Sequence, residues 1–179
     1  MKKLLLLSLS VLLCGSLFAQ SFDSSKLRAG GGFFYASEIQ NVGLTLNGVY
    51  EIDEIWEGSL GFTHIFEKDY VSWNILDLDG HYIFHEESDD LNIYGLAGLS
   101  FTFWKINVPS ETVTETVPYL GEVTMDVPGY EDNGSEIGLN LGVGANYRVA
   151  DNLNLAPELR YTIIDGSYFR IGATLQYMF

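Results

Sequence analysis

The chain contains little cysteine and few basic residues. Of its 179 residues, 1 is cysteine, 9 are lysine or arginine and 24 are aspartate or glutamate, which gives a net charge of −15. So acidic a chain is a poor match for phosphate backbones, and we predict no nucleic-acid partner. Charged residues make up only 18% of the chain, below the roughly 25–35% of a well-solvated surface. We therefore expect that much of the surface does not face water.

Beyond residue 19 the chain also lacks an apolar run of about 18 residues, which excludes a transmembrane helix there. The first 19 residues have the pattern of a secretory signal peptide: two lysines precede an apolar segment, Leu4 to Leu13, and Ala19 marks the expected cleavage point. Cys14 is not expected to carry a lipid, because Leu13 before it is large. Cleavage would leave residues 20–179 as one cysteine-free domain, with 7 basic and 24 acidic residues and a net charge of −17.

Apolar and polar residues alternate with a period of two along most of this domain, which predicts β-strands. The strand expected at 91–104 is apolar on both faces, so its register is not determined, and Pro157 predicts a β-bulge. The strands contain 11 to 15 residues, more than the ~5–6 typical of globular proteins and enough for the ~9–11 that a tilted membrane crossing needs. The eight expected strands span residues 26–36, 42–52, 56–66, 70–84, 91–104, 136–148, 153–164 and 168–179.

The two faces of these strands differ in side-chain size. One face carries Leu, Ile, Val and Phe, with aromatic residues near the strand ends, and the other carries mainly Gly, Asn, Thr and Ser with a few charges. A soluble barrel would bury the bulky set, whereas the small polar set fits the narrow lumen of an eight-stranded barrel in lipid. We therefore predict an all-β chain that forms an eight-stranded antiparallel up-and-down transmembrane β-barrel. A soluble periplasmic β-barrel is the alternative.

The last strand carries a more specific pattern. Phe179 ends the chain, and Tyr177, Leu175 and Ile171 lie on the same face. This ending resembles the C-terminal strand of bacterial outer-membrane β-barrels, and the whole domain resembles their small eight-stranded members of the OmpA and OmpX type. The resemblance implies a location in the outer membrane of a Gram-negative bacterium, among lipid and lipopolysaccharide, with residues 20–179 as the barrel.

The same resemblance implies how the barrel is assembled and oriented. In this family the terminal strand pairs with the first strand, and its aromatic end is a signal for the barrel-assembly machinery. Phe179, Tyr177 and Leu175 would form that signal here. The short turns would then face the periplasm, and the long connection at 105–135 would be extracellular.

The polar face carries charges of both signs that a narrow lumen would bury. Because an unpaired buried charge is costly, we expect arginine–carboxylate pairs that fill the lumen, with a gated polar pore as the functional alternative. Strand direction predicts opposite charges at three levels, from the periplasm outward: Arg28 with Glu51, Arg160 with Asp77, and Arg170 with Glu136. The expected lumen charges are Arg28, Glu51, Glu57, Asp77, Asp79, Glu136, Arg148, Glu158, Arg160 and Arg170.

Three potential metal ligands, Asp77, Asp79 and His81, alternate on one strand face. Alternate strand residues lie roughly 6.5–7 Å apart, too far for all three to bind one ion at about 2.0–2.2 Å. We therefore assign His81 to the lumen network and predict neither a metal nor a cofactor. Catalysis is not expected either, because only His64 of the three histidines lies near the outer end of a strand, where it could join a site in the loops. The chain is predicted not to be an enzyme.

The connection at 105–135 is the one long link between the expected strands. Its Val- and Thr-rich halves could form a β-hairpin above the membrane, and it carries 6 acidic residues against 1 lysine. We interpret it as a surface for an extracellular protein partner, with a merely solvated loop as the alternative. Two functions follow: a structural or surface-interaction role through this loop, or a narrow channel for small or hydrophobic solutes, as in OmpW-like proteins of the resembled family. The candidate contact residues are Thr112, Val113, Val117, Tyr119, Val123 and Met125.

Overall fold

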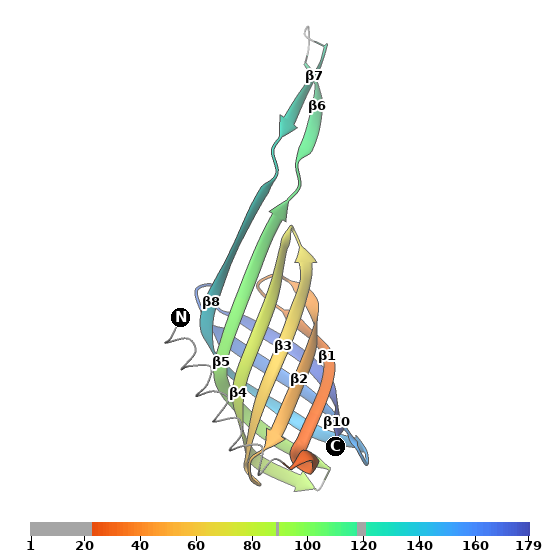
Figure 1. The fold of residues 1–179 in the computed structure, drawn as a ribbon, viewed down its shortest axis with the longest axis vertical. Coiled ribbons are helices and arrows are strands. Elements are labelled where there is room, and N and C mark those ends of the chain that lie inside the picture. Colours follow the sequence, from red (N-terminus) through yellow and green to blue (C-terminus); the bar gives the residue numbers. More distant parts are fainter. Residues whose placement is uncertain (1–22, 89, 118–120) are drawn as a thin grey trace, which may run out of the picture.

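The fold is a closed β-barrel that is extended at one end by a hairpin (Figure 1). The computed structural model describes residues 23–88, 90–117 and 121–179, so the expected signal peptide at 1–19 lies outside the described residues. In this part of the chain, no helix is long and apolar enough to cross a membrane. A short 3-10 helix, η1 (Ser24–Lys26), precedes the first strand.

Eight strands close the barrel in the order β1-β10-β9-β8-β5-β4-β3-β2, and each strand is antiparallel to both neighbours. The prediction of an eight-stranded antiparallel barrel is confirmed. The first and last strands pair, as the terminal pattern implied. The barrel strands are β1 (Leu27–Ala36), β2 (Asn41–Glu51), β3 (Trp56–Lys68), β4 (Val71–Ser88), β5 (Leu91–Val108), β8 (Tyr130–Ala150), β9 (Leu153–Ile163) and β10 (Tyr168–Met178).

The barrel is apolar outside and polar inside. Large apolar side chains are the exposed ones, such as Leu46 at 67% and Ile137 at 70%, whereas Asn140 and Thr162 are buried. This is the reverse of a soluble barrel, and it is the arrangement of a barrel that meets lipid on its outer face. The period of two along each strand therefore separates a lipid face from a lumen face, which confirms the transmembrane interpretation.

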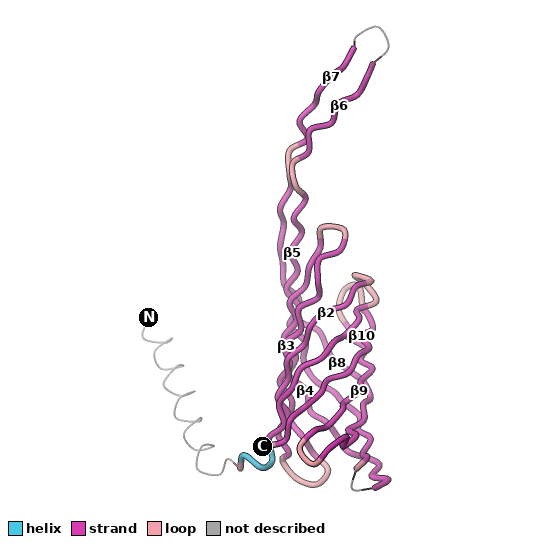
Figure 2. The backbone as a smooth tube through the Cα atoms, turned by 90° about the vertical axis from the view of Figure 1, so that its right-hand side faces the viewer, coloured by secondary structure: helices cyan, strands magenta, loops and turns pink. Residues whose placement is uncertain are grey.

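The two ends of the barrel are different (Figure 2). We call the end that bears strands β6 (Glu111–Val117) and β7 (Gly121–Val127) the hairpin end, and the opposite end, where Phe179 lies close to η1, the terminal end. At the hairpin end, apolar side chains fill the lumen. The buried cluster there consists of Ala36, Ile39, Ile65, Ile75 and Tyr168.

Strands β5 and β8 extend well beyond the barrel. Their pairing continues from Lys105 opposite Asn133 to Val108 opposite Tyr130, and β6 and β7 then form a separate two-stranded sheet. The connection at 105–135, whose two halves were expected to be able to form a β-hairpin, is therefore mostly β-strand. The register of β5, which the sequence left open, places Tyr94 in the lumen, because its paired neighbours in β4 and β8 hold it there.

The predicted β-bulge at Pro157 is wrong. β9 pairs with β10 in one continuous register through Pro157, which lies opposite Ala173. Its pairing with β8 skips 156 and 157 and resumes at Leu155 without a register shift. Because proline has no N–H, part of the hydrogen-bond ladder between β8 and β9 is lost there, but the strand is not displaced. The bulges lie instead near strand ends, at Ile65/Lys68, Ile83/His85, Glu86/Ser88 and Arg148/Ala150.

The seam between β1 and β10 explains the glycine run in the first strand. A Cβ at Gly30 would collide with the carbonyl oxygen of Leu175, and a Cβ at Gly32 would collide with that of Ala173. The two backbones can approach closely enough to close the barrel because these positions have no side chain. Gly48 in β2, by contrast, has open space where a Cβ would lie.

We expect Gly32→Ala to destabilise the barrel by about 1–3 kcal/mol, because the added methyl group overpacks the closing seam. Gly48→Ala is the matched control and should leave stability unchanged or slightly raised. Urea unfolding of the two proteins, refolded in the same detergent micelles, measures the difference. Equal effects of the two substitutions would show that the seam is not a point of close approach.

Candidate functional site

Two arginines on neighbouring strands dominate the middle of the lumen. Arg160 of β9 lies directly opposite Arg170 of β10 in the strand register, and both side chains are almost completely buried. Two adjacent guanidinium groups repel each other in a poorly solvated space unless carboxylates lie between them. The sequence supplies these carboxylates from the facing wall, on β4, and from β9 itself.

Arg160 binds three carboxylates. Its Nη1 lies 2.5 Å from Oδ2 of Asp79 and 3.5 Å from Oδ2 of Asp77. Its Nη2 lies 2.6 Å from Oε2 of Glu158, and its Nε also donates to that oxygen at 2.7 Å. The ring of Phe34 lies on a further side, with its centroid 5.8 Å from the guanidinium carbon. This one side chain therefore links β9 to β4 across the lumen.

Arg170 makes a two-pronged contact with Asp77. Its Nη1 and Nη2 lie 2.6 Å and 2.8 Å from the two carboxylate oxygens, the planar geometry that suits a guanidinium and a carboxylate. Asn140 of β8 donates from its amide nitrogen to both Asp77, at 2.8 Å, and Asp79, at 3.0 Å. Thr162 in turn donates to the Asn140 oxygen at 2.9 Å. The charges of the network are thus paired and also supported by neutral hydrogen-bonding groups.

A second cluster lies nearer the terminal end. Arg28 of β1 donates to Oε1 of Glu57 at 2.9 Å, and Oε2 of Glu57 lies 3.3 Å from Nδ1 of His81. The His81 ring stacks on Tyr94 with a centroid separation of 4.4 Å. The hydroxyl of Tyr94 donates to Glu158 at 2.7 Å and so connects this cluster to the arginine pair. His81 is therefore a lumen residue and a bridge between the two clusters.

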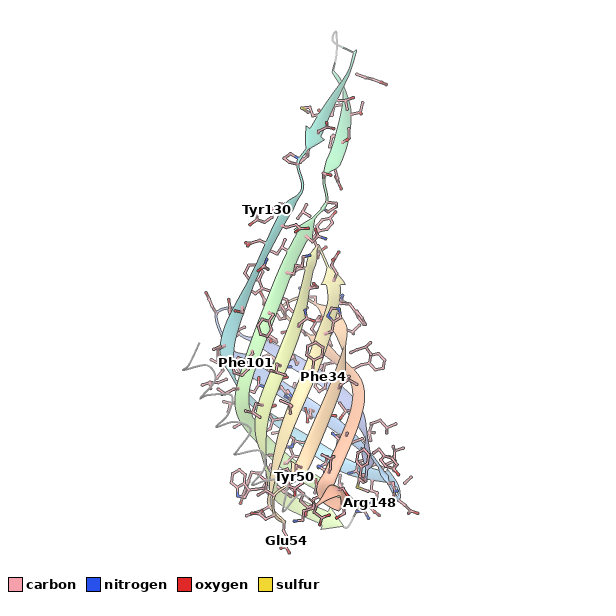
Figure 3. The ribbon with its side chains drawn as sticks, in the orientation of Figure 1. Phe34, Tyr50, Glu54, Phe101, Tyr130 and Arg148 are labelled. Carbon is pink, nitrogen blue, oxygen red and sulfur yellow. The ribbon has the colours of Figure 1, made fainter. Side chains whose placement is uncertain are left out.

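The lumen has a wide cavity at the terminal end and almost no open space at mid-height. The terminal cavity has a volume of about 530 Å³ and is lined by Arg28, Glu51, Glu57 and Arg148, among others. Around Arg160 and Arg170 the open volume is only about 10 Å³. Figure 3 shows that Arg148 lies near the terminal end, whereas Tyr130 of the same strand lies at the base of the hairpin.

Of the ten charged residues expected in the lumen, seven form these two clusters and three do not. Glu51 and Arg148 line the terminal cavity, and Glu136 lines a smaller cavity at the hairpin end. Arg28 and Glu51 thus share one level, but Arg28 binds Glu57. Arg170 was predicted to pair with Glu136, but it binds Asp77. The tilt of the strands brings Arg170 to the level of Asp77 and away from Glu136. The seven clustered residues are Arg28, Glu57, Asp77, Asp79, Glu158, Arg160 and Arg170.

Sequence reasoning missed the neutral partners of these charges. Asn140 and Thr162 occupy lumen positions in the alternating pattern, so their spacing could have identified them. Tyr94 could not be identified, because the strand at 91–104 is apolar on both faces. In the described residues no group of three His, Cys, Asp or Glu side chains is placed to hold a metal ion.

The remaining candidate residues lie outside the lumen. Phe179, Tyr177 and Leu175 are exposed on the outer face at the terminal end, with the rings of Phe179 and Tyr177 edge-on at 5.3 Å. In the hairpin, Val113 pairs with Met125, and the Thr112 hydroxyl donates to Asp126 at 2.9 Å. The backbones of Val117 and Val123 belong to the β6–β7 sheet. Tyr119 lies outside the described residues.

We expect Arg160→Met to destabilise the folded barrel by about 3–5 kcal/mol, because Asp79 and Glu158 would lose their shared cation inside the lumen. Arg148→Met makes the same chemical change at an exposed position and should have little effect. Urea unfolding in detergent micelles measures both. A small effect of Arg160→Met would mean that water already solvates these carboxylates.

Comparisons with known proteins place this geometry in a family. A model of the outer membrane protein beta-barrel domain matches residues 6–179, and the comparison with curated proteins found no match. The barrel is similar to the N-terminal barrel of Pseudomonas aeruginosa OprF (TM-score 0.60, 16% identity, covering 85% of this chain and 96% of that one). It is also similar to Neisserial surface protein A (TM-score 0.58, 16% identity, covering 86% of this chain and 96% of that one). A third similar structure is that of the Yersinia pestis attachment invasion locus protein Ail (TM-score 0.51, 16% identity, covering 84% of this chain and 96% of that one). The chain belongs to the outer membrane protein beta-barrel domain family.

Proposed function

We propose that the protein is a closed outer-membrane barrel whose role is to present the β6–β7 hairpin as an interaction surface outside the cell. One observation carries this proposal: β5 and β8 continue as a paired ribbon beyond the barrel and end in a further two-stranded sheet. A loop that only covered the barrel would not need so long a β-structure. The family supports the outer membrane as the location. Export by a cleaved signal peptide at 1–19 is part of the same proposal.

The projecting ribbon has strand edges that could accept another chain. β8 pairs with β9 only from Leu139 onward, so the segment from Tyr130 to Gly138 has β5 on one side and no described strand on the other. Each strand of the β6–β7 sheet likewise has one unpaired edge within the described residues. Exposed strand edges bind extended polypeptides through backbone hydrogen bonds.

The charge of the ribbon indicates the chemistry of the partner. Lys105 stands alone against six acidic side chains of the hairpin region, and Met125 and Val127 add exposed apolar surface. A basic polypeptide with alternating apolar residues would match this surface, and a polyanion would not. Ail has been described in complex with the heparin analogue sucrose octasulfate, a polyanion that this acidic hairpin would repel. Lipopolysaccharide phosphates would need bridging divalent cations to bind here.

The filled lumen argues against the channel alternative. The open volume around the arginine pair, about 10 Å³, is at most enough for a single water molecule, and the apolar cluster fills the hairpin end. A solute passing through would have to displace buried ion pairs. We also propose a non-enzymatic role, with the outward-facing Phe179 and Tyr177 available to the barrel-assembly machinery.

Replacing residues 112–127 with a short Gly-Ser linker should leave folding intact and abolish partner binding. The barrel keeps its own hydrogen bonds, and loop closure costs little. The probe is a labelled peptide of alternating Lys and Val, titrated into purified protein in neutral nanodiscs, with heat-modifiable gel migration as the folding check. We expect the intact protein to bind the peptide and the shortened protein to lose binding.

The matched control peptide has proline at every second position, which prevents strand addition but keeps the charge. It should bind the intact protein much more weakly. Equal binding of the two peptides would show that the surface attracts positive charge without pairing with a strand. Unchanged binding by the shortened protein would show that the hairpin is only a cover.

A further inference from the structure

The hairpin end contains a cavity that the closed-barrel function does not use. Its volume is about 220 Å³. Val71, Trp73 and Ile164 line it, and the same three side chains pack against the apolar cluster that fills the lumen below. The cavity is therefore a cup that opens at the hairpin end, separate from the arginine network. It also lies within the barrel mouth and not on the β6–β7 sheet.

Two indole rings form one wall of this cup. Trp73 of β4 and Trp104 of β5 are directly opposite each other in the strand register, and both line the cavity. The Trp73 ring rests on Tyr168, with centroids 4.9 Å apart. Trp104 lies against Gly134 of β8, where an added Cβ would come within 2.5 Å of the indole ring. Both rings are thus held in place by their neighbours and present aromatic surface to the cavity.

Three carboxylates line the same cavity and come from three separate elements. Glu38 belongs to the β1–β2 turn, Glu136 to β8 and Asp165 to the β9–β10 turn. The side chains of Glu38 and Asp165 are exposed and that of Glu136 is half-buried. Within the described residues, none of the three carboxylates has a hydrogen bond or an ion pair, and no lysine or arginine lines the cavity. The buried guanidinium of Arg170, whose carbon lies 5.9 Å from the centroid of the Tyr168 ring, is already bound to Asp77. The cavity therefore combines fixed aromatic faces with uncompensated negative charge.

This combination selects one class of ligand. Anions are repelled, and a neutral apolar compound would leave the carboxylates without a counter-charge. A bare metal ion is not favoured, because the carboxylates of the described residues are not placed to bind one ion together. An organic cation with methyl groups satisfies both features, since tryptophan faces attract cations and the carboxylates supply opposite charge. The volume is below the ~300–1,000 Å³ of drug-sized pockets, so the ligand is small.

We propose that this cavity binds a small quaternary ammonium compound, with its ammonium group against Trp73 and Trp104 and within reach of Glu38, Glu136 and Asp165. The wall from β4 and β5 provides the aromatic faces, and the three carboxylates provide the charge. Access is from the hairpin end, so the site serves a solute on that side of the membrane and does not require passage through the barrel.

The test uses choline chloride as the probe and the three tryptophan indole N–H resonances as the readout. The full-length mature protein is labelled with ¹⁵N and held in octyl glucoside micelles, a detergent without a choline group. We expect saturable shifts of the Trp73 and Trp104 resonances. Trp56, which is exposed on the outer face near the terminal end, should not shift and serves as the internal control. Sodium chloride at equal ionic strength should have no effect.

A neutral compound of the same shape, 3,3-dimethylbutan-1-ol, separates charge recognition from simple apolar binding. It should produce little shift. Trp104→Leu should weaken choline binding about fivefold, with Trp104→Phe retaining more affinity, and Glu136→Gln should weaken it about threefold. Glu131→Gln, a carboxylate change on the same strand outside the cavity, should not alter binding. Heat-modifiable migration shows that each variant is folded.

Three results would overturn the proposal. Equal shifts with the neutral compound would make the cavity a nonspecific apolar pocket. Parallel, non-saturating shifts of all three resonances would indicate an effect on the micelle. Unchanged choline affinity in folded Trp104→Leu and Glu136→Gln proteins would show that neither the aromatic wall nor the carboxylates contribute to binding.

Discussion

The buried pairing of arginines with carboxylates is the constraint on which the rest of this barrel depends. The outer face must be apolar to meet lipid, so every charge that the strands carry has to lie in the lumen, at a strand end or beyond the barrel. Arg160 and Arg170 lie side by side at mid-height, and they are neutralised by Asp77 and Asp79 from the facing β4 and by Glu158 beside them. A slip of one residue in either strand would turn these groups toward lipid. The network therefore requires one register of closure, and the close approach at Gly32 requires the same one.

This closure divides the molecule into parts with different chemistry. Below the network lies a polar cavity of about 530 Å³, and above it lies an apolar cluster with a small cup of about 220 Å³ at the rim. Neither open space continues through the middle. The hairpin is built on β5 and β8, two strands that the network holds through Tyr94 and Asn140. A rigid base of this kind can hold the ribbon away from the barrel surface, which is what an interaction surface needs.

Much of the fold was predictable from the sequence because a membrane barrel imposes a strict period of two. The strands around Leu46, Leu139 and Ile171 alternate clearly, and the structure places their apolar side chains outside. The lumen residues followed from the same pattern, but their pairings did not, because strand tilt moves a residue such as Arg170 to another level. The lumen position of Tyr94 could not be predicted, because its strand is apolar on both faces. The β-bulge predicted at Pro157 is absent because a lipid-facing proline can lose one ladder bond without displacing the strand.

Conductance across a planar lipid bilayer tests most directly whether the ion pairs at mid-height close the barrel. The purified protein, inserted as a folded barrel, should give no stepwise currents in neutral salt solutions. Steady single-channel steps whose size changes when Arg148 in the terminal cavity is replaced by methionine would show that ions pass through the lumen. That result would contradict the closed barrel and favour a narrow channel.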